Sequence, residues 1–393
     1  MTYEPPERLN IADYFLDARV REGRGARAAL HTDAGTHSYS AVQSLASRFG
    51  HALNTAGVEP EHRAVIALPD GVEYVGALFG ALKAGAVVVM VNPALPGPEI
   101  EYILAYSRAR VVVTHRETAA AFRGAARDAR SVKAILVVGE EELDRGLAGA
   151  PPALDTHPSH RDDPAIWLFS GGTTGRPKAV VQTHRSFVNT TECYAKGVIG
   201  YTEKDVTLSV PKLYFGYATG SNLFFPFAVG GSAALFPEPP SAEALFDRIR
   251  KFRPTVLVNV PTMIHKMASH PEARKQDLSS IRVCTSAGEA LPAELHERWR
   301  KTFGVELLDG LGTAEMWHIF ISNRPGAAKP GTLGTVVPGF EVKVCDDEGR
   351  ELALGAGGGV TGTSTGTTAR TASTHACEAP PCASGRRLEA PST

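Results

Sequence analysis

SGGTTGRPKAVVQTH, Ser170 to His184, is the most informative stretch of this 393-residue chain. The apolar run AIWLF (165–169) precedes it and predicts a buried strand, and AVVQT (179–183) predicts a second strand directly after the loop. A loop of serine, glycine and threonine offers backbone N–H groups and hydroxyls to phosphate oxygens, and Lys178 adds a compact positive charge. The stretch therefore predicts a polyphosphate cradle between two strands.

A Walker P-loop is the first alternative, and the sequence excludes it on two points. That motif needs Gly-Lys-Ser/Thr at the start of a helix, whereas Pro177 precedes Lys178 here and a strand pattern follows. A solvent-exposed glycine turn is the other alternative, since most short glycine-rich loops are only turns.

Helix and strand patterns alternate on both sides of this loop. AVQSLASRFGHALNTAG (41–57) predicts an amphipathic helix, and strands are predicted at RAVIAL (63–68), AVVVMV (86–91), ARVVVTH (109–115) and AILVVG (134–139). GLAGAPPALDTHPSH (146–160) predicts a linker to a second α/β region. There, polar loops directly follow the strands of TVLVNVPT (255–262) and IRVCTSAGEALP (281–292), Pro292 opens a helix that Gly304 ends, and VELLD (305–309) is the next strand. Open α/β sheets bind ligands at such strand ends.

Composition excludes several functional classes. The formal net charge of −1 shows no basic excess, so nucleic acid is not an expected partner. The five cysteines have no zinc-ligand spacing, which indicates a reducing cytosol and no structural metal. The longest apolar run, Gly76–Val91, contains Lys83 and is shorter than the roughly 18 residues that a membrane span needs. With no signal-peptide pattern at the N-terminus either, we expect a cytoplasmic protein without a membrane partner.

The C-terminal residues differ from the rest of the chain. GTLGTVVPGFEVKVCDDEGREL (331–352) predicts strands joined by a turn at Asp346, Asp347 and Gly349. Residues 353–393 have almost no large apolar side chain and no periodicity, so we expect this low-complexity tail to be disordered. The abrupt change suggests the hypothesis that a frameshift produced the tail.

SGGTTGRPK is similar to the phosphate-loop signature of the superfamily of acyl-CoA synthetases, luciferases and peptide-synthetase adenylation domains. LKAGAVVVMVNP (82–93), SAGEALP (286–292) and DGLGTAE (309–315) resemble further motifs of that superfamily, in the same order. The resemblance covers roughly residues 10–352 and implies an α/β fold, the N-terminal domain of an adenylate-forming enzyme (1–352). In that domain, two βα subdomains with stacked sheets (10–158 and 159–329) precede a truncated β-barrel subdomain (330–352).

The resemblance also implies roles for particular residues. The implied phosphate ligands are Ser170, Gly171, Gly172, Thr173, Thr174, Gly175 and Lys178. The implied adenine-side residues are Gly288, Glu289, Ala290, Asp309 and Gly310. Glu315 would hold Mg²⁺, for which one carboxylate is enough because Mg²⁺ keeps waters and binds substrate phosphates. Lys178 and Glu315 are thus the implied catalytic residues. Ala314 replaces the threonine usual in the superfamily, and Thr313 beside it is the expected substitute contact for ATP.

Two segments indicate the acid. KLYFGYATGSN (212–222) and EMWHIFISN (315–323) resemble pocket segments of benzoate-CoA ligases. By that likeness the acid would be surrounded by Phe215, Gly216, Tyr217, Ala287, Leu311, His318 and Ile319. A slot between small residues and aromatic faces suits a flat ring. The alternative is ordinary core packing, with His318 as a hydrogen-bonded structural residue.

The implied activity is ATP-dependent conversion of a benzoate-like carboxylate to an acyl-adenylate and then a CoA thioester. ATP, Mg²⁺ and CoA are the implied cofactor, metal and co-substrate, and any self-association is expected to give a homodimer. The superfamily's small C-terminal catalytic domain, with its lysine, is not recognisable after Leu352, so we expect impaired activity. Two alternatives are a non-catalytic remnant that binds ATP or an aryl acid, and an adenylation domain that loads a carrier protein.

Overall fold

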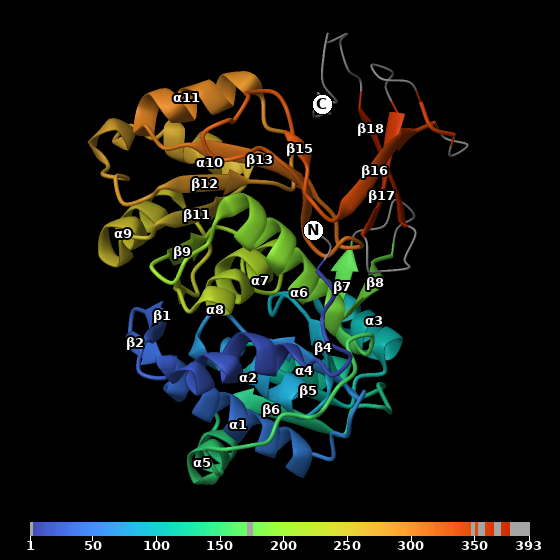
Figure 1. The fold of residues 1–393 in the computed structure, drawn as a ribbon. Coiled ribbons are helices and arrows are strands. Elements are labelled where there is room, and N and C mark those ends of the chain that lie inside the picture. The colour runs from blue at the N-terminus through green and yellow to red at the C-terminus, as the bar shows by residue number, and fades with distance from the viewer. Residues whose placement is uncertain (1–2, 171–175, 347–349, 353–357, 365–370, 378–393) are drawn as a thin grey trace.

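The computed structural model describes residues 3–170, 176–346, 350–352, 358–364 and 371–377. Two large sheets lie one above the other with helices between them and on their outer faces (Figure 1). This arrangement confirms the predicted α/β fold with stacked sheets.

The first sheet has six strands in the order β6-β5-β3-β4-β7-β8. Its strands are β3 (Arg63–Ala67), β4 (Val87–Met90), β5 (Val111–His115), β6 (Ala134–Val138), β7 (Pro164–Ser170) and β8 (Lys178–Thr183). The valine-rich strands β3 to β6 run parallel and are mostly buried, whereas β7 and β8 form an antiparallel pair. Buried parallel strands read as continuous β-branched runs, which explains why the sequence located them.

The second sheet has nine strands in the order β15-β14-β13-β12-β11-β9-β10-β1-β2. Its strands are β1 (Ala28–Thr32), β2 (Gly35–Ser38), β9 (Val206–Ser209), β10 (Ser232–Ala234), β11 (Val256–Asn259), β12 (Val283–Ser286), β13 (Leu307–Gly312), β14 (Ile319–Ser322) and β15 (Thr335–Val336). Strands β9 to β13 and β1 pair in parallel, so their carboxyl ends share one edge.

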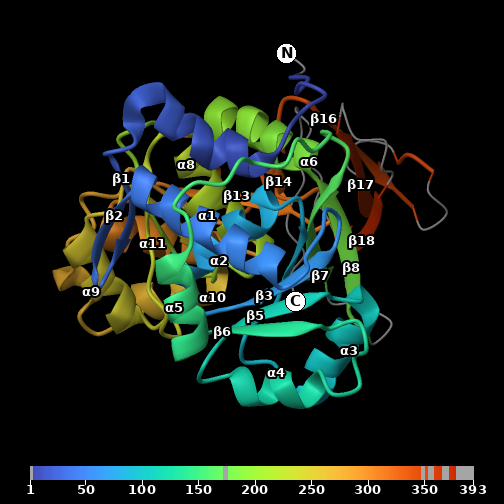
Figure 2. The same cartoon turned by 90° about the horizontal axis from the view of Figure 1, so that it is seen from below.

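Helices form three layers around these sheets. The α-helices are α1 (Tyr39–Thr55), α2 (Val72–Lys83), α3 (Gly97–Ser107), α4 (Ala119–Ala125), α5 (Glu141–Gly149), α6 (His184–Thr190), α7 (Gly216–Thr219), α8 (Phe225–Val229), α9 (Ala242–Phe252), α10 (Pro261–Ala268) and α11 (Ala293–Phe303). Shorter π and 3-10 segments are η1 (Asp13–Asp17), η2 (Val20–Arg24), η3 (Thr191–Ile199), η4 (Gly220–Phe224) and η5 (Ala273–Lys275). Figure 2 shows α3 and α4 beyond β5 and β6, on the opposite side from α1 and α2.

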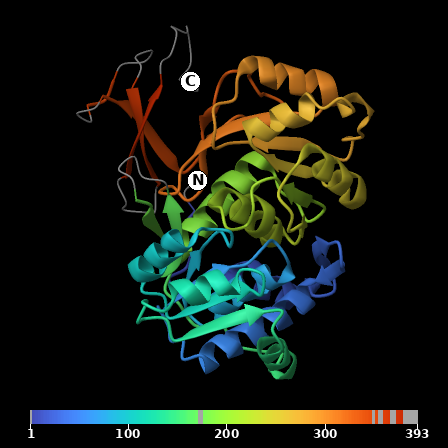
Figure 3. The ribbon, with the colours of Figure 1, turned by 180° about the vertical axis from the view of Figure 1, so that it is seen from behind.

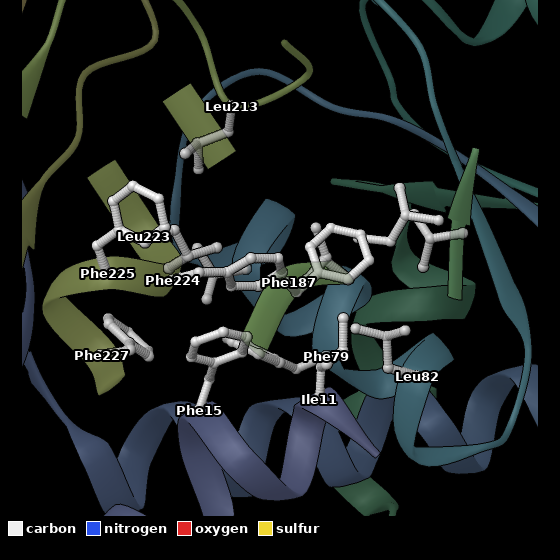
Figure 4. Packing of buried hydrophobic residues seen from close by; sticks show 14 of the residues in the cluster. Ile11, Phe15, Phe79, Leu82, Phe187, Leu213, Leu223, Phe224, Phe225 and Phe227 are labelled. Atoms are coloured by element: carbon white, nitrogen blue, oxygen red, sulfur yellow. The ribbon is translucent and has the colours of Figure 1, made fainter. Parts of the chain in front are cut away.

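Aromatic side chains fill the layer between the sheets (Figure 4). The rings of Phe15 and Phe224 stack with centroids 4.5 Å apart, and Phe79 lies 5.9 Å from both Phe224 and Phe227. These rings come from η1, from α2 and from the adjoining segments η4 and α8, three regions that are remote from one another in sequence. Because such aromatic contacts add about 0.5–1.5 kcal/mol each beyond area burial, they tie the two halves of the fold together.

The sheets do not follow the subdomain boundaries expected from the sequence. Strands β1 and β2 precede the first sheet in the chain yet join the second, where β1 pairs with β10. Strands β7 and β8 follow the linker yet extend the first sheet through pairing of β7 with β4. For β7 the reason is that the long irregular connection from α5 places no limit on which sheet edge the next strand meets.

A separate three-stranded sheet contains β16 (Phe340–Cys345), β17 (Gly358–Ser364) and β18 (Thr371–Cys377). It projects from the body next to β7 and β8 (Figure 3). The sequence predicted disorder throughout residues 353–393, but two segments of that region are strands paired antiparallel with β16 and with each other. The exposed edge of β16 supplies unpaired backbone groups, and backbone pairing needs no large apolar side chain. In the part of the chain that the structure describes, no helix is long and apolar enough to span a bilayer.

His184, the last residue of the phosphate-loop motif, anchors the N-terminal segment. Its Nδ1 accepts a hydrogen bond of 3.1 Å from the Ile11 backbone N–H, and the ring is 3% exposed. Burial lowers the pKa of this histidine from 6.5 to about 4. The folded protein therefore holds the neutral ring at pH values where the unfolded chain binds a proton.

We expect this histidine to make the protein less stable as the pH falls from 6.5 to 4. The contribution lost over that window is about 3 kcal/mol, since one pKa unit corresponds to about 1.4 kcal/mol. His184→Asn keeps an acceptor oxygen but does not titrate. Urea unfolding of both proteins between pH 7 and 4 checks this: the wild type should lose about 3 kcal/mol more than the variant, and parallel curves would contradict it.

Candidate functional site

A cavity of about 470 Å³ opens where strands of both large sheets end. Residues at the carboxyl ends of β4, β7, β12 and β13 line it, together with the segment between β9 and α7. Its lining residues are Met90, Val91, Asn92, Leu95, Glu99, Ile103, Leu168, Phe169, Ser170, Pro177, Tyr214, Phe215, Gly216, Tyr217, Ala287, Gly288, Gly312, Thr313, Ala314, Trp317, His318 and Ile319. Such strand ends are where open α/β sheets bind their ligands.

The flanks of the predicted phosphate loop meet at one edge of this cavity. Ser170 ends β7 and pairs in register with Lys178, the first residue of β8, and the Lys178 side chain is exposed. The Tyr102 hydroxyl donates a 2.9 Å hydrogen bond to the Pro177 carbonyl, so α3 holds the returning strand. The strand continuation confirms that this is no Walker motif. Gly171, Gly172, Thr173, Thr174 and Gly175 lie outside the described residues.

The predicted magnesium ligand follows β13. Gln182 on β8 donates from Nε2 to the carbonyls of Ala314 (2.6 Å) and Glu315 (3.0 Å), which ties this turn to the strand after the phosphate loop. The Glu315 side chain is half-buried. Among the residues that the structure describes, no group of three or more histidine, cysteine or acidic side chains gathers as a metal site would require. A carboxylate on a turn tied to the strand that follows the phosphate loop fits Mg²⁺, which retains water ligands and takes others from phosphates.

Thr313 and Ala314 both line the cavity. Thr313 Oγ1 accepts a 3.2 Å hydrogen bond from the Met316 N–H, and its own hydroxyl proton stays available for donation. The methyl group of Ala314 can donate nothing. Thr313 thus brings a hydroxyl to the cavity wall, and its role as the substitute contact for ATP stays a prediction.

The adenine-side residues separate into two groups. Gly288, with φ +90°, lines the cavity, whereas Glu289, Ala290, Asp309 and Gly310 do not. Glu289 Oε2 instead accepts hydrogen bonds from the Thr262 N–H (2.9 Å) and hydroxyl (2.6 Å) at the start of α10. Asp309 is buried, and burial raises its pKa to about 7. A Cβ on Gly310 would lie 2.9 Å from the Ile321 carbonyl. The close pairing of β13 with β14 therefore leaves room only for glycine at this position.

His318 forms part of the cavity wall. Its Nε2 lies 3.1 Å from the Tyr217 carbonyl and 3.1 Å from Ser221 Oγ. Because a carbonyl only accepts, Nε2 carries the proton. Burial lowers the pKa of His318 to about 3, so the ring is neutral at physiological pH. Gly220 makes room for it, since a Cβ there would lie 2.5 Å from the ring.

Six of the seven predicted acid-pocket residues line the cavity: Phe215, Gly216, Tyr217, Ala287, His318 and Ile319. Leu311 does not, because side chains alternate along β13 and Leu311 packs against the core. Phe215 is 54% exposed at the cavity. The sequence interpretation missed the apolar residues of β4, α3 and β7, although the motif at 82–93 already indicated that β4 ends there.

Comparison with known proteins agrees with this geometry. The family model described as AMP-binding enzyme matches residues 16–368. The benzoate–CoA ligase of Thauera aromatica is 37% identical over 351 residues, 88% of this chain and 67% of the relative. A benzoate CoA ligase structure from Burkholderia xenovorans LB400 superposes with a TM-score of 0.84 at 38% identity, covering 92% of this chain and 72% of that one.

The structure of the anthranilate CoA ligase AuaEII in complex with anthranoyl-AMP superposes with a TM-score of 0.89 at 35% identity, covering 93% of this chain and 70% of that one. The chain thus spans about two thirds of the length of the curated relatives that it matches. The family match extends over most of the chain, and the cavity lies among its motifs. The chain belongs to the AMP-binding enzyme family.

Proposed function

We propose that this protein activates an aromatic carboxylate with ATP and transfers the acyl group to CoA. The observation that carries the proposal is the cavity itself, which is largely apolar and has aromatic faces, and which lies between the flanks of the phosphate loop and the turn that carries Glu315. Relatives named as benzoate and anthranilate CoA ligases support the aryl acid as substrate and CoA as acceptor.

Charge is the main obstacle to the first step. An oxygen of the acid attacks the α-phosphorus of ATP, and pyrophosphate leaves, although nucleophile and phosphates are both negative. Lys178 would sit against the β- and γ-phosphates, and Mg²⁺ held by Glu315 would neutralise further phosphate charge. Holding acid and phosphate in line supplies much of the remaining acceleration.

The acid pocket contributes orientation. Tyr217 is fixed by a 2.8 Å hydrogen bond between its hydroxyl and Thr285 Oγ1. Its backbone carbonyl accepts a hydrogen bond from His318 Nε2. Because His318 is neutral, it offers no cation that would trap the carboxylate at the far wall. A benzoate ring would therefore lie among the aromatic and aliphatic side chains, with its carboxylate directed toward the phosphates. The thiol of CoA would then attack the acyl carbon and release AMP.

We expect ATP–pyrophosphate exchange to depend on aryl acids. Benzoate, 2-aminobenzoate and 4-hydroxybenzoate should each support exchange at least about tenfold faster than acetate or octanoate, because the aromatic and aliphatic walls of the cavity suit a flat ring. Reactions without acid provide the baseline. Exchange with acetate but not with the benzoates would overturn the pocket assignment.

Two further measurements separate the alternatives. Calorimetric binding of ATP and benzoate without any exchange would indicate a non-catalytic remnant. Mass spectrometry of reactions with CoA tests the acceptor: accumulation of an acyl-adenylate that CoA never consumes would favour a carrier protein instead.

A further inference from the structure

The wall of the acid cavity begins in a segment with no regular structure. Residues 210–215 connect β9 to α7 without forming a helix or strand, and Tyr214 and Phe215 line the cavity. A sheet or helix would fix such a segment through its own hydrogen-bond ladder. Within this segment the Phe215 N–H donates a 2.9 Å hydrogen bond to the Lys212 carbonyl, and the backbone groups of Leu213 between them are held by side chains of other elements.

Leu213 is the point at which the segment is held. Its N–H donates a 2.8 Å hydrogen bond to Asp70 Oδ1, and its carbonyl accepts a 3.0 Å hydrogen bond from the Tyr74 hydroxyl. Thr219 Oγ1 donates to the same carbonyl. Asp70 and Tyr74 belong to the loop after β3 and to the first turn of α2, 143 and 139 residues away from Leu213. Both backbone groups of Leu213, the residue directly before the cavity wall, are therefore fixed from the six-stranded sheet's side.

Asp70 and Tyr74 together form a clamp on the Leu213 peptide. The clamp and its surroundings bury more charge than packing alone would require. Asp70 is 4% exposed and Lys212 is 7% exposed, and Lys212 Nζ donates a 2.7 Å hydrogen bond to the Phe236 carbonyl. The ammonium also lies 3.4 Å from the centroid of the Phe236 ring. Burying such charges costs several kcal/mol, and apolar side chains would fill the same space without that cost. The carboxyl group of Asp70 adds the hydrogen bond to Leu213 and an electrostatic attraction to the Lys212 ammonium.

We infer that Asp70 and Tyr74 are positioning residues for the aromatic acid: they hold the Leu213 peptide and thereby set the position of the Tyr214–Tyr217 wall. The inference rests on the proposed function, because it assigns the clamp to acid binding. Neither residue lines the acid cavity, so both act through Leu213. In the proposed function ATP contacts other elements, so loss of the clamp should weaken the binding of benzoate and leave the binding of ATP unchanged.

Three variants test the clamp. Asp70→Ala removes the acceptor, Tyr74→Phe removes the donor, and Asp70→Asn restores an acceptor oxygen without the charge. We expect Asp70→Ala and Tyr74→Phe to raise the KM for benzoate in pyrophosphate exchange about tenfold or more, since one buried hydrogen bond is worth roughly 1.5 kcal/mol. The KM for ATP should stay within about twofold, and Asp70→Asn should recover most of the benzoate KM.

Tyr39→Phe is the matched control. Tyr39 is likewise fully buried, and its hydroxyl donates a 2.6 Å hydrogen bond to the Gly231 carbonyl away from the cavity. The Tyr39→Phe variant should lose about as much free energy of unfolding as Tyr74→Phe, without a change in the KM for benzoate. Equal changes in both KM values, or the same benzoate KM in Tyr39→Phe and Tyr74→Phe, would show that the clamp is only structural.

Hydrogen exchange measured by mass spectrometry tests the clamp without any substrate. Peptides that cover residues 212–219 should exchange about tenfold faster in Asp70→Ala and Tyr74→Phe than in Tyr39→Phe, because local opening loses one buried hydrogen bond. Unchanged exchange would overturn the inference even if the enzyme activates benzoate. Faster exchange in a protein that binds no aromatic acid would instead refute the proposed function, and the assignment of the clamp to acid binding with it.

Discussion

Replacing Glu315 by glutamine is expected to slow benzoate-dependent pyrophosphate exchange by about 10²- to 10³-fold, the usual cost of losing one group that stabilises transition-state charge. Glutamine preserves size and hydrogen bonding but removes the charge that would hold Mg²⁺. The fold should be unaffected, because Gln182 binds the backbone carbonyls of residues 314 and 315 and not the carboxylate. The measurement is the exchange rate at saturating ATP and benzoate.

Magnesium dependence distinguishes a lost ligand from a general defect. The Glu315→Gln variant should need a higher Mg²⁺ concentration for half-maximal exchange than the wild type. Glu294→Gln is the control, since Glu294 is an exposed carboxylate in the first turn of α11, outside the cavity. If Glu315→Gln has the Mg²⁺ response and rate of the wild type, Glu315 is a surface carboxylate and the metal lies elsewhere.

The elements that the sequence located are those with local signals. Pro292 and Gly304 bound α11 as predicted, with Gly304 at φ +69° in the left-handed conformation that glycine adopts easily. The runs of valine at β4 and β5 could be recognised as buried parallel strands from composition alone. A cap or a β-branched run acts within a few residues, so no tertiary information is needed.

Sheet membership could not be predicted in the same way. The pairing of β1 with β10 joins Leu30 to Ala233, about two hundred positions along the chain. The clamp on Leu213 likewise combines residues whose spacing has no sequence signature. Such contacts are set by how helices pack between the two sheets, and a single sequence carries no direct record of that packing.

The residues of the candidate site were likewise predictable only in part. The motifs brought Phe215, Tyr217, Ala287 and His318 to one cavity, because each follows a strand of the nine-stranded sheet at the edge where the cavity opens. Leu311 was included because it lies inside a motif, although alternation along β13 directs it away from the cavity. Motif membership therefore predicts the neighbourhood of a residue better than the direction of its side chain.

Gly80→Ala is expected to lower the free energy of unfolding by about 3 kcal/mol, a large fraction of the roughly 5–15 kcal/mol that stabilises a domain. The helices α1 and α2 cross at this glycine. A Cβ on Gly80 would lie 2.6 Å from the Ala46 carbonyl oxygen, 2.7 Å from Phe49 Cβ and 2.9 Å from the Gly50 nitrogen. Two of these atoms are backbone, so no side-chain rotation relieves the clash and the helices must separate.

Gly124→Ala provides the matched control for this prediction, because Gly124 also lies inside a helix, α4, but among the described residues nothing approaches within 4 Å of the position that an alanine methyl group would take there. Helix propensity alone favours alanine over glycine by about 1 kcal/mol, so the control should be unchanged or slightly more stable. Separation of α1 from α2 would also displace Phe79, which stacks on Phe227 in the layer between the sheets. Urea unfolding of the three proteins decides the matter: equal stabilities for Gly80→Ala and Gly124→Ala would mean that the helices can move apart at no cost, and that the close crossing contributes nothing to the fold.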